Sequence, residues 1–155
     1  MHLAEFIRQP RGPRQFDLWK WSKSIPSCIG ALGVELQTPI DALPIESMVE
    51  TAMAAVEFVG NSGTLLLALL YGHYKLAERE EWLGFWGVPP GLGPDQLLGQ
   101  LRSADISVAD DLYCCIFVDP AWDPEHKLSF TLTEGRIVDV NGEKYSLIGQ
   151  TLTLG

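Results

Sequence analysis

The hydrophobic period of this chain changes twice along its length, and these changes constrain its fold more than any other feature. Segments 16–22 and 31–38 alternate apolar and polar residues, which is typical of half-buried strands. Between 44 and 79 the apolar residues recur every three or four positions, which predicts helices. Segments rich in β-branched and aromatic residues return between 111 and 149. Helices grouped between two sets of strands indicate an α+β fold.

The helical part of the sequence divides into two long helices. The first spans 44–59, and we expect Gly60 and Asn61 to end it. Ser62 is placed to cap a second helix that follows directly. We expect these two helices to form an antiparallel pair joined by a tight turn. A short third helix is predicted at 94–102, with a proline in its first turn.

The last third of the chain is predicted to be an antiparallel meander. Its expected strands are 111–119, 127–133, 136–140 and 144–149. Asn141-Gly142, between the last two, is a strong signal for a two-residue hairpin. The complete prediction is therefore an antiparallel meander sheet with two to three helices packed on one face. We expect a single domain over 1–155, in which residues 1–14 form a lead-in.

Composition limits the classes of partner. The net charge of −9 argues against a nucleic acid or an anionic membrane, because both bind positively charged surfaces. It suits a basic protein instead. The longest apolar run, 65–71, is much shorter than the roughly 20 residues of a spanning helix. Three cysteines without zinc spacing and no signal-peptide pattern predict a cytoplasmic protein without a cofactor.

The charge is concentrated in one stretch. Residues 104–125 contain no Lys or Arg, and the stretch ends in the turn that holds Trp122 and His126. An exposed aromatic flanked by acids is typical of a surface that meets a basic partner. The predicted partner-binding residues are Asp105, Asp110, Asp111, Asp119, Trp122, Asp123, Glu125 and His126.

The same turn admits other interpretations. Asp119, Asp123, Glu125 and His126 could bind a metal, but the turn holds two prolines, no glycine and a single histidine. A carboxylate pair could act as acid and base, yet no nucleophile motif accompanies it. We therefore predict neither a metal site nor catalytic residues. In a purely structural role, Trp122 folds over the hairpin, while Glu125 or a backbone carbonyl holds His126.

Other reactive or aromatic residues are expected to be structural. His73 lies on an apolar helix face and is predicted to be buried there. Cys114 and Cys115 are predicted to be strand residues without a nearby cation to activate them. The aromatic residues Trp82, Phe85 and Trp86 are predicted to be core at a helix end.

The stretch "FVDPAWDPEHKLSFTLTEGRIVDV" resembles the "WDxEHG" strand-turn-strand of a group of small bacterial proteins. Those proteins recur among presumed immunity partners of contact-delivered toxins. The resemblance extends loosely over roughly residues 30–140, and Trp122, Asp123, Glu125 and His126 match the motif. Lys127 departs from it, because the pattern has Gly there. The resemblance implies a protein that binds and blocks a cognate toxin, and it brings no catalytic residues.

Two alternatives to an immunity or antitoxin role remain open. One is a small metal-dependent hydrolase that uses Asp119, Asp123, Glu125 and His126. The other is a generic regulatory or scaffold subunit. The leading prediction is a non-enzymatic protein, monomeric or homodimeric, that neutralises a basic toxin by direct contact.

Overall fold

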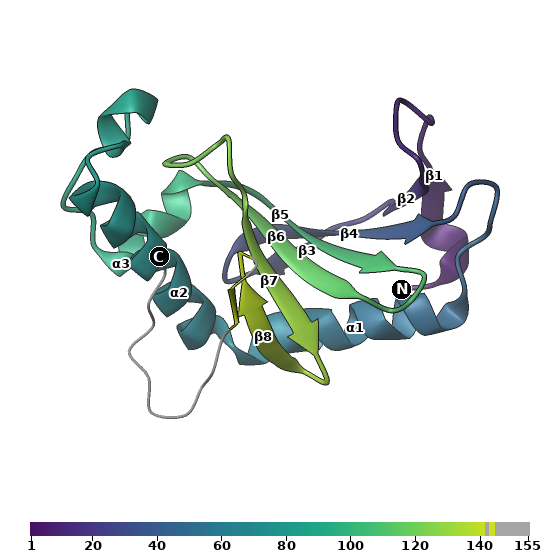
Figure 1. The fold of residues 1–155 in the computed structure, drawn as a ribbon. Coiled ribbons are helices and arrows are strands. Elements are labelled where there is room, and N and C mark those ends of the chain that lie inside the picture. Colours follow the sequence, from purple (N-terminus) through teal and green to yellow (C-terminus); the bar gives the residue numbers. More distant parts are fainter. Residues whose placement is uncertain (142, 145–155) are drawn as a thin grey trace.

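The computed structural model describes residues 1–141 and 143–144, and the strands of that part form one sheet (Figure 1). The strands are β1 (Phe6–Arg8), β2 (Asp17–Trp21), β3 (Ile25–Ser27), β4 (Gly30–Thr38), β5 (Leu101–Ala109), β6 (Cys114–Pro120), β7 (Leu128–Thr133), β8 (Arg136–Val140) and β9 (Glu143–Lys144). The helices are α1 (Glu46–Asn61), α2 (Gly63–Arg79) and α3 (Pro94–Leu97), with 3₁₀ turns η1 (Leu3–Glu5), η2 (Leu83–Trp86) and η3 (Leu98–Gln100).

The strand order is β1-β2-β4-β5-β6-β7-β8-β9, with β3 paired to β4. Among the described strands, β4 and β5 pair in parallel and every other pair is antiparallel. Parallel neighbours need a long crossover, and here the crossover contains α1, α2 and α3. Grouped helices and a largely antiparallel sheet confirm the predicted α+β fold.

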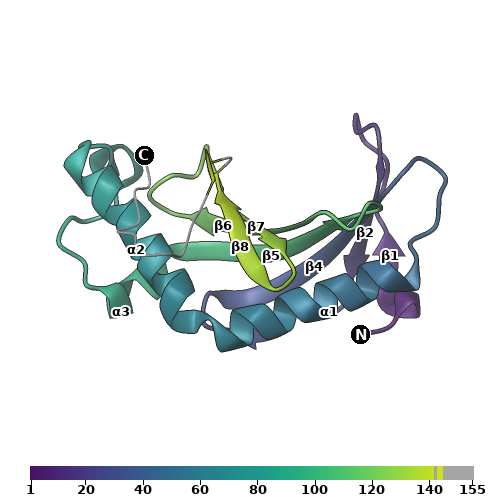
Figure 2. The ribbon, with the colours of Figure 1, turned by 60° about the horizontal axis from the view of Figure 1, so that its bottom comes forward.

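Helix α1 covers one face of the sheet and lies against β5 and β6 (Figure 2). The buried side of α1 consists of Met48, Val49, Ala52, Ala55 and Val59. Alternate residues of the strands complete this core, for example Leu36 of β4, Ile106 of β5 and Ile116 of β6. Residues between them, such as Glu35 and Asp105, therefore point to the opposite face of the sheet.

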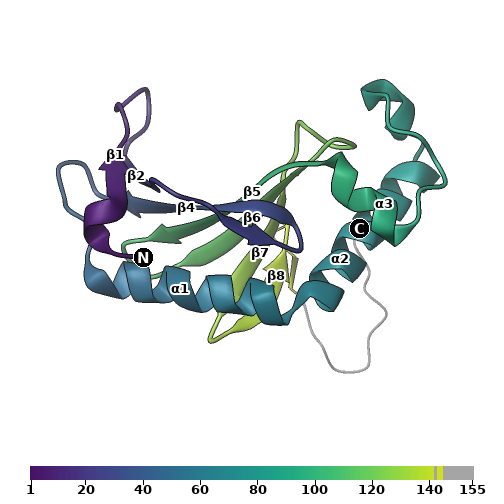
Figure 3. The ribbon, with the colours of Figure 1, turned by 180° about the vertical axis from the view of Figure 1, so that it is seen from behind.

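The two long helices do not form the predicted antiparallel pair. Gly60 and Asn61 lie inside the last turn of α1 instead of ending it, and only Ser62 separates the helices. One residue leaves no room for the chain to reverse, so the helix axis turns by 80° instead. Helix α2 thereby runs past the ends of the strands, on the side where α3 lies (Figure 3).

The chain between α2 and β6 also differs from prediction. The predicted third helix, 94–102, is limited to α3 and η3, and Leu101 already begins β5. Strand β5 was not predicted, although Ala104, Ile106 and Val108 alternate along it as buried residues. It is the strand that connects the N-terminal strands to the C-terminal meander.

The predicted C-terminal hairpin is present. Val140 pairs with Glu143, and Asn141 lies in the connection between β8 and β9; Gly142 is outside the described residues. Asn141 has the positive φ of 52° that such turns require. The remainder of the predicted last strand, residues 145–149, lies outside the described residues.

The predicted lead-in contributes both a strand and ion pairs. Strand β1 pairs with β2, and two arginines of the lead-in contact Asp17, whose side chain is 1% exposed. Nε of Arg11 lies 2.9 Å and Nη2 of Arg8 lies 3.1 Å from its carboxylate oxygens. The backbone N–H of Asp41 donates a further hydrogen bond of 2.8 Å. These partners, Arg11 first, lower the pKa of Asp17.

No single helix within the described residues combines the length and the apolar composition needed to cross a membrane.

Candidate functional site

The connection between β6 and β7, residues 121–127, is anchored by its tryptophan. Trp122 is fully buried, and its indole Nε1 donates a hydrogen bond of 2.8 Å to Nδ1 of His73 on α2. Its ring also meets the Tyr74 ring edge-on, with the centroids 5.7 Å apart. Trp122 therefore fastens the turn to α2. Because it is buried, it supports the turn and cannot itself contact a partner.

Asp123 stands between two histidines. Its Oδ1 accepts a hydrogen bond of 3.3 Å from the backbone N–H of His126 and lies 3.1 Å from Nδ1 of that residue. Its Oδ2 lies 3.8 Å from Nε2 of His73. The His126 ring is 80% exposed, whereas that of His73 is buried. The carboxylate thus links a buried histidine to a solvent-facing one.

The hydrogen bond from Trp122 determines the state of His73. An indole N–H can only donate, so Nδ1 of His73 carries no proton and Nε2 carries it instead. Burial lowers the pKa of His73, and the Asp123 carboxylate opposes part of that shift. The geometry and the lowered pKa both favour the neutral ring. His73 is a buried structural histidine, as the sequence predicted.

An open hollow of about 510 Å³ lies beside this turn. Its residues are Trp82, Phe85, Trp86, Asp123, Glu125 and His126. Phe85 is 83% exposed and Trp86 is 38% exposed, which is unusual for large aromatic residues. Three aromatic side chains and two carboxylates therefore meet at one place on the surface.

Helix α2 positions both sides of the hollow. Through His73 it holds the turn that carries Asp123. Three residues of loop 87–93, which follows η2, are tied to the same helix. The Tyr74 hydroxyl donates to the carbonyl of Pro89 (2.7 Å) and accepts from the N–H of Leu92 (3.1 Å), while the Glu78 carboxylate accepts from the N–H of Gly91 (2.6 Å). Residues on one rigid helix thus fix both the turn and the loop behind the aromatic segment.

The exposure of Phe85 and Trp86 corrects the prediction that this aromatic cluster is core. Only Trp82, at the end nearer α2, is partly buried against the core. The segment leaves the helical period after Arg79 and folds into η2, which ends at Gly87 with a positive φ of 68°. Glycines on both sides of "FW" were a usable signal, because they mark a turn in which large side chains lack a regular buried face.

The predicted acidic stretch does not form one surface. Asp110 and Asp111 lie in the β5–β6 turn, at the opposite end of β6 from Asp123 and Glu125. A strand of this length separates its ends by roughly 20 Å. Asp123, Glu125 and His126 remain together beside the hollow. The acids are therefore distributed over separate parts of the molecule.

Asp105 and Asp119 lie on the sheet face that α1 does not cover. Asp105 neighbours Gly33 of β4, where an added Cβ would lie 2.4 Å from its Oδ1. Burial raises the pKa of Glu35, and the negative charge of Asp105 raises it further. Asp119 pairs with Ser103, and its Oδ1 is buried without a hydrogen-bond partner in the described structure.

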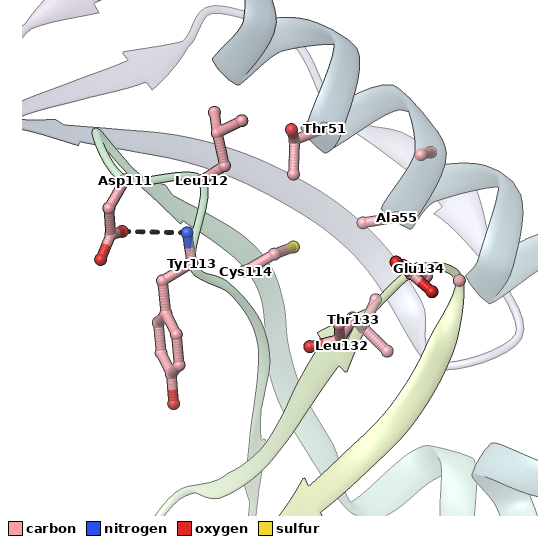
Figure 4. Close-up of a pocket in the computed structure, with 11 residues that line it drawn as sticks. Thr51, Ala55, Asp111, Leu112, Tyr113, Cys114, Leu132, Thr133 and Glu134 are labelled. Atoms are coloured by element: carbon pink, nitrogen blue, oxygen red, sulfur yellow. Dashed lines mark hydrogen bonds between the residues drawn. The ribbon is translucent and has the colours of Figure 1, made fainter.

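A second cavity, of about 540 Å³, separates α1 from the tips of two hairpins (Figure 4). Thr51 and Ala55 line it from α1, and Leu112 and Glu134 come from the hairpin turns. The Sγ atom of Cys114 points toward the helix (Figure 4), and burial, with a smaller effect of Cys115, raises the pKa of this thiol to about 12. Cys114 is therefore a poor nucleophile, as its predicted place in a strand implied.

The geometry of the hollow suits binding better than metal chemistry. Among the described residues, no group of three or more His, Cys, Asp or Glu side chains is arranged to hold a metal ion. Asp119, one of the four residues of the hydrolase alternative, belongs to β6 and does not line the hollow. Asp123, Glu125 and His126 do line the hollow, and the exposed aromatic rings beside them add apolar contact area.

Comparison with protein-family models, with curated proteins and with solved structures found no match to this chain. The resemblance to toxin-immunity partners therefore stays a prediction.

Proposed function

We propose that this protein binds a basic partner protein by direct contact and neutralises it, as an immunity or antitoxin protein does. The observation that carries the proposal is the hollow in which the exposed Phe85 and Trp86 adjoin Asp123 and Glu125. Protein interfaces concentrate their binding energy in a few aromatic anchors. The Trp122 turn supports such a surface by fixing Asp123 to α2.

Electrostatics supports a basic partner. The protein carries a net charge of −9, and the residues that line the hollow include no Lys or Arg. Opposite net charges accelerate the encounter of two proteins and disfavour acidic competitors. Fast association is an advantage for such a protein, because the toxin has to be bound before it can act on the cell.

Co-expression with the product of the neighbouring gene tests the proposal. We expect that product to inhibit growth when expressed alone, and to co-purify with this protein when the two are expressed together. Growth should recover in the second case. The proposal fails if the neighbouring product is neither toxic nor bound.

Two variants locate the contact. Replacing Phe85 and Trp86 together by Ser removes the exposed aromatic area, and we expect it to abolish co-purification while the protein stays folded. Tyr113→Ser is the matched control, because Tyr113 is 55% exposed but lies at the opposite end of β6. Equal loss of binding in both variants would place the contact elsewhere.

A further inference from the structure

We propose that the hollow beside the Trp122 turn is a receptor for one arginine side chain, which stacks on the aromatic rings and pairs with the carboxylate of Glu125. This inference rests on the proposed function and names the group of the basic partner that the hollow would bind. It follows from the chemistry of the six lining residues.

The aromatic wall favours a cation. A guanidinium over a Trp or Phe face is attracted by the negative face of the ring, and its planar shape also stacks on it. Phe85 and Trp86 belong to η2, and Trp82 directly precedes it, so three rings come from five consecutive residues. The exposure of Phe85 and Trp86 leaves ring surface for a partner to cover.

The acidic wall provides two carboxylates, which differ in whether other side chains of the protein already occupy them. Asp123 already accepts the N–H of His126 and faces both histidines. Glu125 is exposed and makes no hydrogen bond or ion pair within the described structure. Its carboxylate is therefore available to the forked N–H donors of a guanidinium, which fit a carboxylate through two parallel hydrogen bonds.

The hollow has room for an arginine side chain. About 510 Å³ lies within the range of small-ligand pockets. The walls are held by α2 through His73 and Tyr74, so the receptor exists before the partner arrives. A site that is already formed loses little conformational freedom on binding.

Titration with acetyl-arginine amide, followed by NMR of the tryptophan indole N–H signals, tests the inference without the partner protein. We expect the signals of Trp82 and Trp86 to shift and to saturate in the millimolar range. The citrulline analogue has the same shape without the charge and should cause no saturable shift. If arginine gives no saturable shift, or if citrulline binds equally well, the inference is overturned.

Two charge variants separate local binding from general attraction to an acidic protein. Glu125→Gln should weaken arginine binding about three-fold, in line with the modest strength of an exposed ion pair. Asp110→Asn makes the same change in net charge at the far β5–β6 turn and should leave binding unchanged. Equal effects would show a non-specific attraction and would overturn the inference. Co-purification of the neighbouring gene product tests the proposed function independently of this result.

Discussion

The indole N–H of Trp122 reaches Nδ1 of His73 across 2.8 Å, in a place where both side chains are shielded from solvent. The two residues come from distant parts of the sequence, and their hydrogen bond joins the β6–β7 connection to α2. Among the described residues, neither of these two nitrogen atoms makes another hydrogen bond. The pair therefore behaves as one structural unit.

Trp122→Phe should destabilise the protein by about 2 kcal/mol or more, because it leaves Nδ1 of His73 buried without a donor and removes part of a buried ring. Urea unfolding followed by circular dichroism measures this loss. Trp86→Phe changes an exposed tryptophan in the same way and should alter stability by less than about 0.5 kcal/mol. Similar values for the two variants would contradict the buried hydrogen bond.

The pH dependence of stability should reveal the lowered pKa of His73. Burial holds this pKa below the ordinary value of 6.5, so between the two values the unfolded chain binds the proton more readily than the folded one. The contribution of His73 to stability is then fully present above about pH 6.5, and it is lost as the pH falls toward the folded-state pKa. Urea midpoints measured between pH 5 and pH 8 test this expectation.

His73→Gln is the comparison for that experiment. The pKa of Glu35 is raised in the folded protein. Its effect on stability is therefore opposite to that of His73, because it stabilises the fold as the pH falls through the folded-state pKa of Glu35. Both proteins contain Glu35, so its contribution cancels when the stability of His73→Gln is subtracted from that of the wild type at each pH. A pH profile that is unchanged in the variant would show that His73 does not cause the loss.

Leu112→Gly should raise the free energy of unfolding by up to about 1 kcal/mol. Leu112 has a φ of 68°, a conformation that costs a bulky residue more than it costs glycine. Thermal unfolding measures the gain, and Asp110→Gly in the same turn, where φ is not positive, should give none. A clear destabilisation by Leu112→Gly would mean that packing of the leucine over the cavity outweighs backbone strain.

Cys114 should resist alkylation in the folded protein. Its pKa of about 12 leaves almost no thiolate at pH 8, and the residue is buried. Iodoacetamide followed by site-resolved mass spectrometry should find Cys114 unmodified in buffer. In urea Cys28, Cys114 and Cys115 should all react. Rapid modification of native Cys114 would show that the α1 side of the sheet opens.

Sequence periodicity was sufficient for the fold class, because α1, α2 and the strands of the meander each carry a clear pattern over their whole length. It failed at β5, where the short residues Ala104 and Ser107 weaken the alternating signal. The parallel pairing of β4 with β5 is a contact between remote segments, and no local pattern encodes it.

The site was predictable only in part. "WDPEH" identified the turn, since its residue types are unusual together. The flanking glycines could have signalled the exposure of Phe85 and Trp86, but the position of these residues beside the turn could not be read from the sequence. That position depends on the 80° turn between α1 and α2, which brings the end of α2 to this loop. Burial of Trp122 has the same origin, as its partner His73 lies on α2.

The parallel pairing of β4 with β5 also bears on how the chain reaches this structure. The hairpins of β5 to β9 and those of β1 to β4 bring together residues that are close in sequence, so each set can form early. Leu32 meets Ala104 only after the whole helical crossover has been spanned, and closing a loop of that length costs chain entropy. We therefore expect the seam between β4 and β5 to close last, with α1 docking across it as the rate-limiting event of folding.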